Sequence, residues 1–146
     1  MEDALSLFTL VDRLVAVRPL TATSTARLVG KALLPVVGES TDRTLIYVAR
    51  GTPEFERVEL RVAGPRSSNN DQLLILEVDG SRCLKLDDMR RHYGPSPETG
   101  VPSPHQPADA PLYFRYPVKG GTLSFGFAQR GEECLKSVVL DIAAAK

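Results

Sequence analysis

The sequence predicts an α+β fold, an antiparallel sheet of about six strands with two to three helices packed on one face. Three observations favour it. Apolar residues near the start recur at helical spacing, later segments alternate apolar and polar residues, and a helix followed by three strands occurs twice. The chain of 146 residues suits a single domain, 1–146, with half-repeats at 24–78 and 84–142. Residue identity between the halves is slight, so the repeat is one of element order.

Two helices are expected in the first part of the chain. Residues 4–17 carry apolar side chains three and four positions apart, which gives one buried helical face. Residues 24–34 form the second helix, with Ser24 or Thr25 as its N-cap and Pro35 shortly after its end.

Three strands follow, at 44–49, 55–63 and 72–78. The middle segment alternates apolar residues with charged ones. We therefore expect Glu59 and Arg61 to lie on the solvent side of that strand.

A short third helix is expected to begin near Asp87 and to end at Gly94. Residues 95–111 contain six of the eleven prolines and show no apolar period. We expect an extended or mobile loop there, because such a long loop in a compact domain is usually functional or disordered.

The last part of the chain predicts three more strands, at 112–118, 123–128 and 134–142. Gly120 and Gly121 lie between the first two and supply the backbone freedom of a hairpin turn.

Composition excludes several classes of function. Lys plus Arg and Asp plus Glu number 18 each, so the chain lacks the basic excess of a nucleic-acid-binding protein. No run of about 18 apolar residues is present, so we predict no membrane span. No Walker or GxGxxG motif occurs, and two cysteines without a CxxC motif do not suggest zinc, so we expect no cofactor and no metal.

Cys83 and Cys134 are the two cysteines. They are either unrelated buried thiols of a cytoplasmic protein or one disulfide, which would close a loop of about fifty residues and stabilise the fold by roughly 4 kcal/mol. We favour the disulfide, and with it a periplasmic location. The acidic start, Met1 to Asp3, is unlike a signal peptide, so this location requires that a signal has been removed.

The candidates for catalysis are few. His92 and His105 are the two histidines, and a small hydrolase or ligand-binding domain that uses either one is an alternative interpretation. The pairs Asp87–Asp88 and Glu132–Glu133 are interpreted as solvated charge. We therefore predict that the protein is not an enzyme.

Aromatic residues beside the proline-rich loop predict a surface for a protein partner, because stiff aromatic side chains give large contact area at low entropy cost. Strand alternation places Tyr113 and Arg115 outward and Phe114 in the core. We select Tyr93, His105, Tyr113 and Arg115 as partner-binding residues.

Over residues 83–142 the chain resembles small periplasmic immunity proteins that neutralise type VI secretion effectors. It is also similar to the helix-plus-meander unit of β-lactamase-inhibitor-like proteins and outer-membrane assembly lipoproteins. The residues that carry the likeness are Met89, Tyr93, Gly94, Tyr116, Gly121 and Phe125. The resemblance implies binding and inhibition of a partner.

The preferred hypothesis is a non-enzymatic protein-binding module, an inhibitor or immunity-like protein that blocks a partner enzyme with surface loops. The partner would be a secreted toxin or a cell-wall enzyme. The alternative is an assembly or scaffold component that self-associates, for example as a homodimer, through an exposed strand edge.

Overall fold

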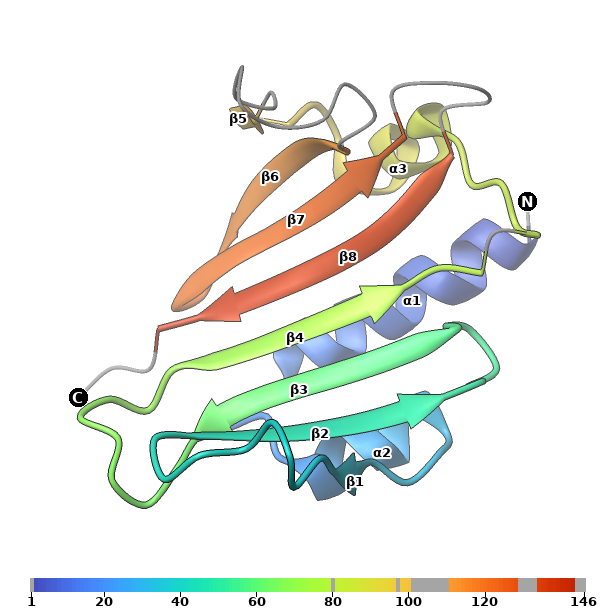
Figure 1. Ribbon diagram of the computed structural model, residues 1–146. Coiled ribbons are helices and arrows are strands. Elements are labelled where there is room, and N and C mark those ends of the chain that lie inside the picture. The colour runs from blue at the N-terminus through green and yellow to red at the C-terminus, as the bar shows by residue number, and fades with distance from the viewer. Residues whose placement is uncertain (1, 80, 97, 101–110, 129–133, 144–146) are drawn as a thin grey trace.

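The computed structural model describes residues 2–79, 81–96, 98–100, 111–128 and 134–143. Its helices and strands follow the chain in the order shown in Figure 1. They are α1 (Glu2–Ala16), α2 (Ala22–Val29), β1 (Leu34–Pro35), β2 (Thr44–Arg50), β3 (Arg57–Ala63), β4 (Gln72–Glu77), α3 (Leu86–Tyr93), β5 (Glu98–Gly100), β6 (Leu112–Val118), β7 (Gly121–Phe127) and β8 (Leu135–Ile142).

The strands form one antiparallel sheet in the order β1-β2-β3-β4-β8-β7-β6-β5. The predicted α+β class is therefore confirmed. The strand count is higher than about six because the short strands β1 and β5 add one strand at each edge. The last strands of the two half-repeats, β4 and β8, lie side by side in the middle of the sheet. That residues 24–78 and 84–142 are repeats of one another stays a prediction.

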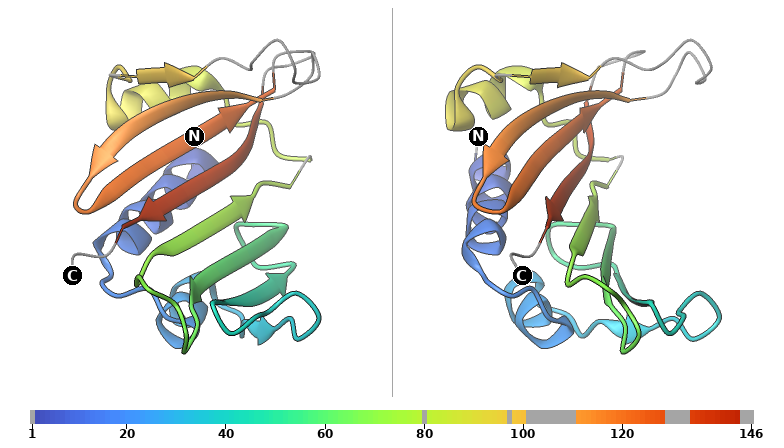
Figure 2. Two further views of the ribbon diagram at one scale, coloured as in Figure 1. Left: turned by 60° about the vertical axis from the view of Figure 1, so that its left-hand side comes forward. Right: turned by 90° about the vertical axis from the view of Figure 1, so that its left-hand side faces the viewer.

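All three helices pack on one face of the sheet, as Figure 2 shows. Helix α1 runs beneath the central strands and buries Leu7, Phe8, Val11 and Leu14. The phenyl ring of Phe8 meets Phe125 of β7 edge to face, with 5.9 Å between centroids. The core lies between this helical layer and the inward-facing residues of the strands.

Helix α2 differs from the predicted helix 24–34 at both ends. Its N-cap is Thr21, whose side chain accepts from the backbone N–H of Ser24 at 3.0 Å, while Ser24 Oγ accepts from the backbone N–H of Thr21. This capping box starts the helix at Ala22. The helix ends at Val29 because Gly30 adopts the left-handed conformation, with φ 80°, so the termination comes before Pro35.

The proline-rich loop is part of the sheet where it begins, contrary to the predicted loop over 95–111. Residues Glu98–Gly100 form β5 and pair with β6, with Glu98 opposite Arg115. Just before β5, Gly94 O accepts a hydrogen bond from the hydroxyl of Tyr116 at 2.6 Å. Local sequence could not show this pairing, because the edge of β6 supplies the partner. Residues 101–110 lie outside the described residues.

Cys83 and Cys134 lie at disulfide distance, with their Cα atoms 4.8 Å apart, so the predicted pairing is confirmed. The bridge joins the segment before α3 to the start of β8, beside a hydrogen bond from Leu135 N to Leu84 O of 2.9 Å. Such a pair fits an oxidising compartment. Among the described residues, no helix is long and apolar enough to cross a membrane.

Candidate functional site

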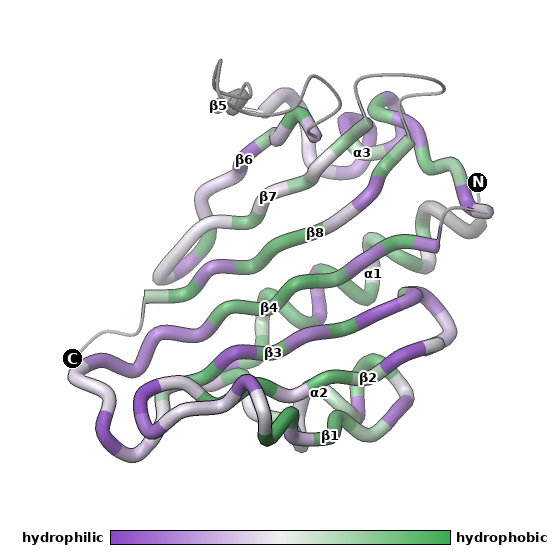
Figure 3. The backbone as a smooth tube through the Cα atoms, viewed as in Figure 1, coloured by the Kyte–Doolittle hydropathy of each residue, from purple (hydrophilic) through white to green (hydrophobic). Residues whose placement is uncertain are grey.

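One face of the sheet carries the helices, whereas no described helix covers the other, which we call the open face (Figures 1 and 2). Hydrophobic and hydrophilic residues alternate along the central strands, as Figure 3 shows. Alternation directs the core residues Leu60, Leu74 and Leu140 toward the helices. The residues between them therefore form the open face.

The middle of the open face is apolar. Leu73 and Ile75 of β4 lie there, and Val139 of β8 is paired with Ile75. All three are half-buried although no helix in the described part of the chain covers them. We call these three residues the apolar seam. A partly apolar centre with charged surroundings is the usual composition of a contact surface for another protein.

Glu59 of β3 lies beside this seam and is buried, with 4% of its surface exposed. The prediction that alternation would place it in solvent is therefore wrong. Its carboxylate accepts from Arg57 at 2.6 Å and from Arg61 at 2.5 Å, so the two guanidinium groups shield it from water. Burial alone would raise the pKa of Glu59, but the two arginines outweigh burial and lower it below its usual value.

A further salt bridge connects the cluster of Arg57, Glu59 and Arg61 to the neighbouring strand, β4. Arg57 Nη1 donates to Glu77 of β4 at 3.2 Å. Its two carboxylate partners raise the pKa of Arg57 against the opposing effect of burial, so the guanidinium stays charged. The prediction that Arg61 faces solvent is consistent with its exposed side chain.

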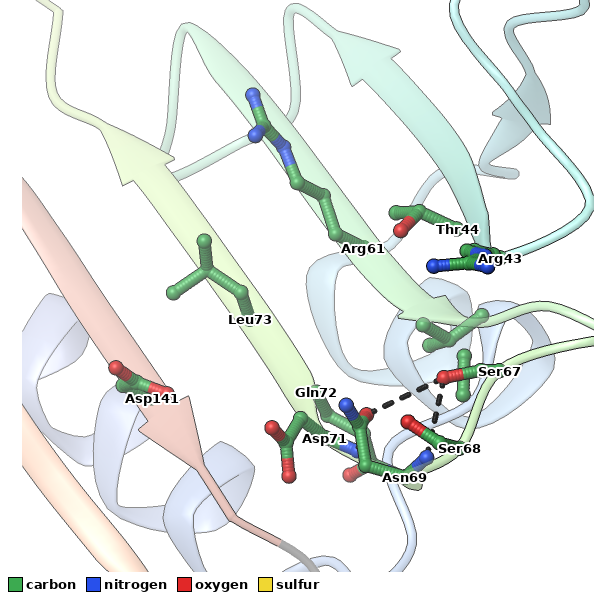
Figure 4. Close-up of a pocket in the computed structure, with 12 residues that line it drawn as sticks. Arg43, Thr44, Arg61, Ser67, Ser68, Asn69, Asp71, Gln72, Leu73 and Asp141 are labelled. Carbon is green, nitrogen blue, oxygen red and sulfur yellow. Dashed lines mark hydrogen bonds between the residues drawn. The ribbon is translucent and has the colours of Figure 1, made fainter.

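A pocket of about 360 Å³ opens at the end of the open face where β3 turns into β4 (Figure 4). Arg43 and Arg61 line it from the β2 and β3 side, and Asp71 and Asp141 line it from the β4 and β8 side. The turn is held by its own bonds, among them Asp71 N donating to Asn69 Oδ1 at 3.0 Å. The pocket therefore has two arginines on one side and two aspartates on the other.

Of the predicted partner-binding residues, the structure brings Tyr113 and Arg115 together on the open face, on β6. Tyr113 is opposite Gly126 of β7, and a Cβ added to that glycine would lie 2.9 Å from Tyr113 Cε1. The phenol ring therefore rests on the glycine backbone. Phe114 is buried in the core, as the strand alternation predicts.

Tyr93 lies on the other side of the sheet. It packs on Phe125 with ring centroids 4.9 Å apart, and its hydroxyl donates to Asp12 Oδ1 of α1 at 2.8 Å. Burial, reinforced by Asp12, raises the pKa of Tyr93 far above its usual value. Tyr93 therefore does not share a surface with Tyr113. His105 lies outside the described residues.

His92 joins helix α3 to helix α1. Its Nε2 lies 2.6 Å from Asp12 Oδ2, and its ring is 5.5 Å from that of Phe8 and 4.5 Å from that of Tyr93. These contacts indicate that His92 has a structural role as a link between α1 and α3. In the part of the chain that the structure describes, no three His, Cys, Asp or Glu side chains gather as a metal site.

Sequence reasoning did not select Arg43, Arg61, Asp71 or Asp141 as site residues. The sequence feature that could have found them is the alternation of β3, β4 and β8. Once these strands are aligned, it places Arg61, Leu73 and Asp141 on the same face of the sheet. The alignment itself depends on β4 pairing with β8, two segments far apart in the chain.

No protein-family model, curated protein or solved structure matches this chain, so the open face is interpreted from its own geometry.

Proposed function

We propose that this domain is a non-enzymatic protein-binding module that blocks a partner enzyme in an oxidising compartment, the periplasm. The observation that carries the proposal is the open face, a sheet surface with an apolar seam and charged surroundings that no described helix covers. A partner that covers the seam would remove Leu73, Ile75 and Val139 from water.

The size and shape of this face suit a protein. The strands from β2 to β6 span five spacings, roughly 24 Å, and seven residues of strand extend roughly 23 Å, which gives on the order of 500 Å² of flat surface. This is somewhat less than the roughly 800 Å² that each partner buries in a typical stable complex. Neighbouring loops would supply the rest of the contact, as they do in inhibitors that present loops on a rigid sheet.

Tyr113 and Arg115 are the side chains that we expect to contribute most to the affinity. Tyr and Arg are enriched among residues that dominate binding energy, because each combines a large flat surface with hydrogen-bonding groups. The ring of Tyr113 already lies against Gly126, which reduces the conformational entropy that it would lose when it is covered.

The cysteine pair supports the oxidising compartment of this proposal. A disulfide between Cys83 and Cys134 persists where thiols are oxidised, and the periplasm is such a place. The hydrolase alternative gains no support from His92, whose described contacts are with Asp12 and two aromatic rings.

The test is position-specific cross-linking in the native host. A photoreactive phenylalanine replaces Tyr113 on the open face, and a matched variant carries it at Leu5, which is 60% exposed on the helical layer. We expect a discrete covalent adduct from position 113 and none from position 5. The captured protein, once purified, should form a stoichiometric complex with the domain and lose its enzymatic activity.

Variants Arg115→Ala and Tyr113→Ala should each weaken that purified complex by about tenfold or more, whereas Leu5→Ala should leave it unchanged. Equal adducts from positions 113 and 5, no adduct from either, or a complex that leaves the partner fully active would each refute the proposal.

A further inference from the structure

We propose that the pocket at the end of the open face binds a short zwitterionic peptide, with the peptide carboxylate at its arginines and the peptide ammonium at its aspartates. The residues that carry the charges are Arg43, Arg61, Asp71 and Asp141. This site is independent of the protein partner proposed above. Leu73 is the one residue of the apolar seam that lines the pocket, and neither Tyr113 nor Arg115 is among its lining residues.

The charges of opposite sign are held apart across the pocket. Leu73 of β4 is paired with Arg61 of β3 on one side and with Asp141 of β8 on the other, so the two charged residues have backbones roughly 10 Å apart. Arg43 directly precedes β2 and Asp71 directly precedes β4, and these strands are likewise two spacings apart in the sheet. Figure 4 shows Arg43 and Asp141 at opposite sides of the pocket. The sheet therefore fixes a basic side and an acidic side.

These charges do not neutralise one another. Among the described residues, no salt bridge joins an arginine of the pocket to an aspartate of the pocket, and Arg43, Asp71 and Asp141 take part in none. All three residues are exposed. Arg61 uses its Nε for Glu59, and its two terminal amino groups make no hydrogen bond within the described part of the chain. Both sides of the pocket are therefore able to bind a charged group of a ligand.

The balance of charge selects the class of ligand. Two arginines and two aspartates give the lining a net charge of zero, so a purely anionic or purely cationic ligand is attracted by one side and repelled by the other. A zwitterion is attracted by both sides. An extended dipeptide places its terminal charges roughly 7 Å apart. This separation fits between arginine and aspartate side chains whose backbones are roughly 10 Å apart.

The rest of the lining also suits a peptide. Leu73 provides apolar surface between the two charged sides, and the hydroxyl groups of Thr44 and Ser68 are able to bond to a peptide amide. The turn from β3 to β4 forms one wall and is held by a hydrogen bond from Asn69 N to Ser67 Oγ at 3.3 Å. The volume of about 360 Å³ lies near the lower end of the range of small-ligand pockets, as a dipeptide requires.

We expect the binding to be weak and sensitive to salt. All four charged residues are exposed, and ion pairs at exposed positions contribute little and are screened by salt. A dissociation constant on the order of 1 mM is therefore expected at low ionic strength.

The test is a titration of the oxidised chain, followed by the NMR chemical shifts of its backbone amides at constant low ionic strength. The probes are alanyl-leucine with both termini free, its N-acetylated form, which lacks the ammonium, and its C-terminal amide, which lacks the carboxylate. The variants are Arg43→Gln and Asp141→Asn, with Arg13→Gln on the exposed surface of α1 as the matched control. Neither Arg43 nor Asp141 makes a described side-chain hydrogen bond, so both variants should fold, and their spectra without ligand verify it.

The free dipeptide should shift the amides of the turn from β3 to β4 in a saturable way, and each blocked form should bind at least about threefold more weakly. Asp141→Asn should weaken binding of the free dipeptide but not of the acetylated form, because that form has no ammonium left to lose a partner. Arg43→Gln should likewise weaken binding of the free dipeptide but not of the amide. Arg13→Gln should bind all three probes as the unmodified chain does.

Three results would each overturn the inference. The first is the absence of a saturable shift at this turn, and the second is blocked forms that bind as tightly as the free dipeptide. The third is a set of variant effects that does not depend on which terminus is blocked, because a merely structural role of Arg43 or Asp141 would weaken all three probes alike.

Discussion

Removing the disulfide should cost this domain a large part of its stability. The bridge links residues 51 positions apart, and in the chain-entropy model a loop of that length corresponds to roughly 4 kcal/mol at 25 °C. Cys83 and Cys134 are both half-buried, so replacing them with alanine removes little packed volume and the entropic contribution should dominate. With a typical unfolding entropy per residue, 4 kcal/mol lowers the melting temperature of a chain this long by roughly 13 °C.

The assay compares chemical unfolding of the oxidised chain with that of Cys83→Ala/Cys134→Ala, each with and without a reducing agent. Reduction should destabilise the unmodified chain by the same amount as the double substitution and should leave the double variant unchanged. A loss below about 1 kcal/mol would refute the reasoning, because the bridge would then not restrict the unfolded chain as a closed loop does. A free-thiol count under denaturing conditions, with none before reduction and two after, verifies the starting material.

Three further predictions concern single residues. Glu59→Gln should lower the free energy of unfolding by about 1–2 kcal/mol at neutral pH, because it weakens two charge-assisted hydrogen bonds. Because its folded pKa lies below its unfolded value, the stabilisation should be complete above about pH 5 and decline in acid, and the Gln variant should show a smaller decline. The pKa of Tyr93 is raised, so the folded chain should retain at least one un-ionised tyrosine in an alkaline absorbance titration, and Asp12→Ala should bring the ionisation of Tyr93 to lower pH. Burial also raises the pKa of Tyr116, so that variant identifies which tyrosine is observed. The stability that Tyr93 provides is complete below about pH 10 and is lost as the pH rises above it. Gly126→Ala should displace the ring of Tyr113 and change its near-ultraviolet circular dichroism, with a loss of about 1–3 kcal/mol; an unchanged spectrum would show that the ring does not rest on the glycine.

Much of the fold could be predicted because local pattern and local chemistry decide it. The segments predicted as strands became β2, β3, β4, β6, β7 and β8, and the first apolar helix became α1, because a chain must bury one face of each element. The ends of α2 were placed wrongly because Thr21 competes with Ser24 as the cap, and Gly30 can either continue a helix or end one.

The candidate site depends more on tertiary structure. Alternation indicated correctly that Tyr113 and Phe114 face opposite sides, but it gave the wrong environment for Glu59, because two arginines of the same strand cover that carboxylate. Closeness to the proline-rich loop had grouped Tyr93 with Tyr113, although α3 lies beneath the sheet and carries Tyr93 into the aromatic core. Sequence distance to the proline-rich loop could not distinguish the two sides of the sheet.

The sequence by itself determined the three helices approximately and the six longer strands, which side of most strands is apolar, and which two cysteines were available to pair. Only the tertiary structure decided that β4 lies beside β8, and this pairing creates the apolar seam and brings Arg61, Leu73 and Asp141 into one row. The physical reason is that side-chain alternation is a local property of the backbone. The order and register of strands, by contrast, depend on contacts between segments that lie far apart in the sequence, as β4 and β8 do.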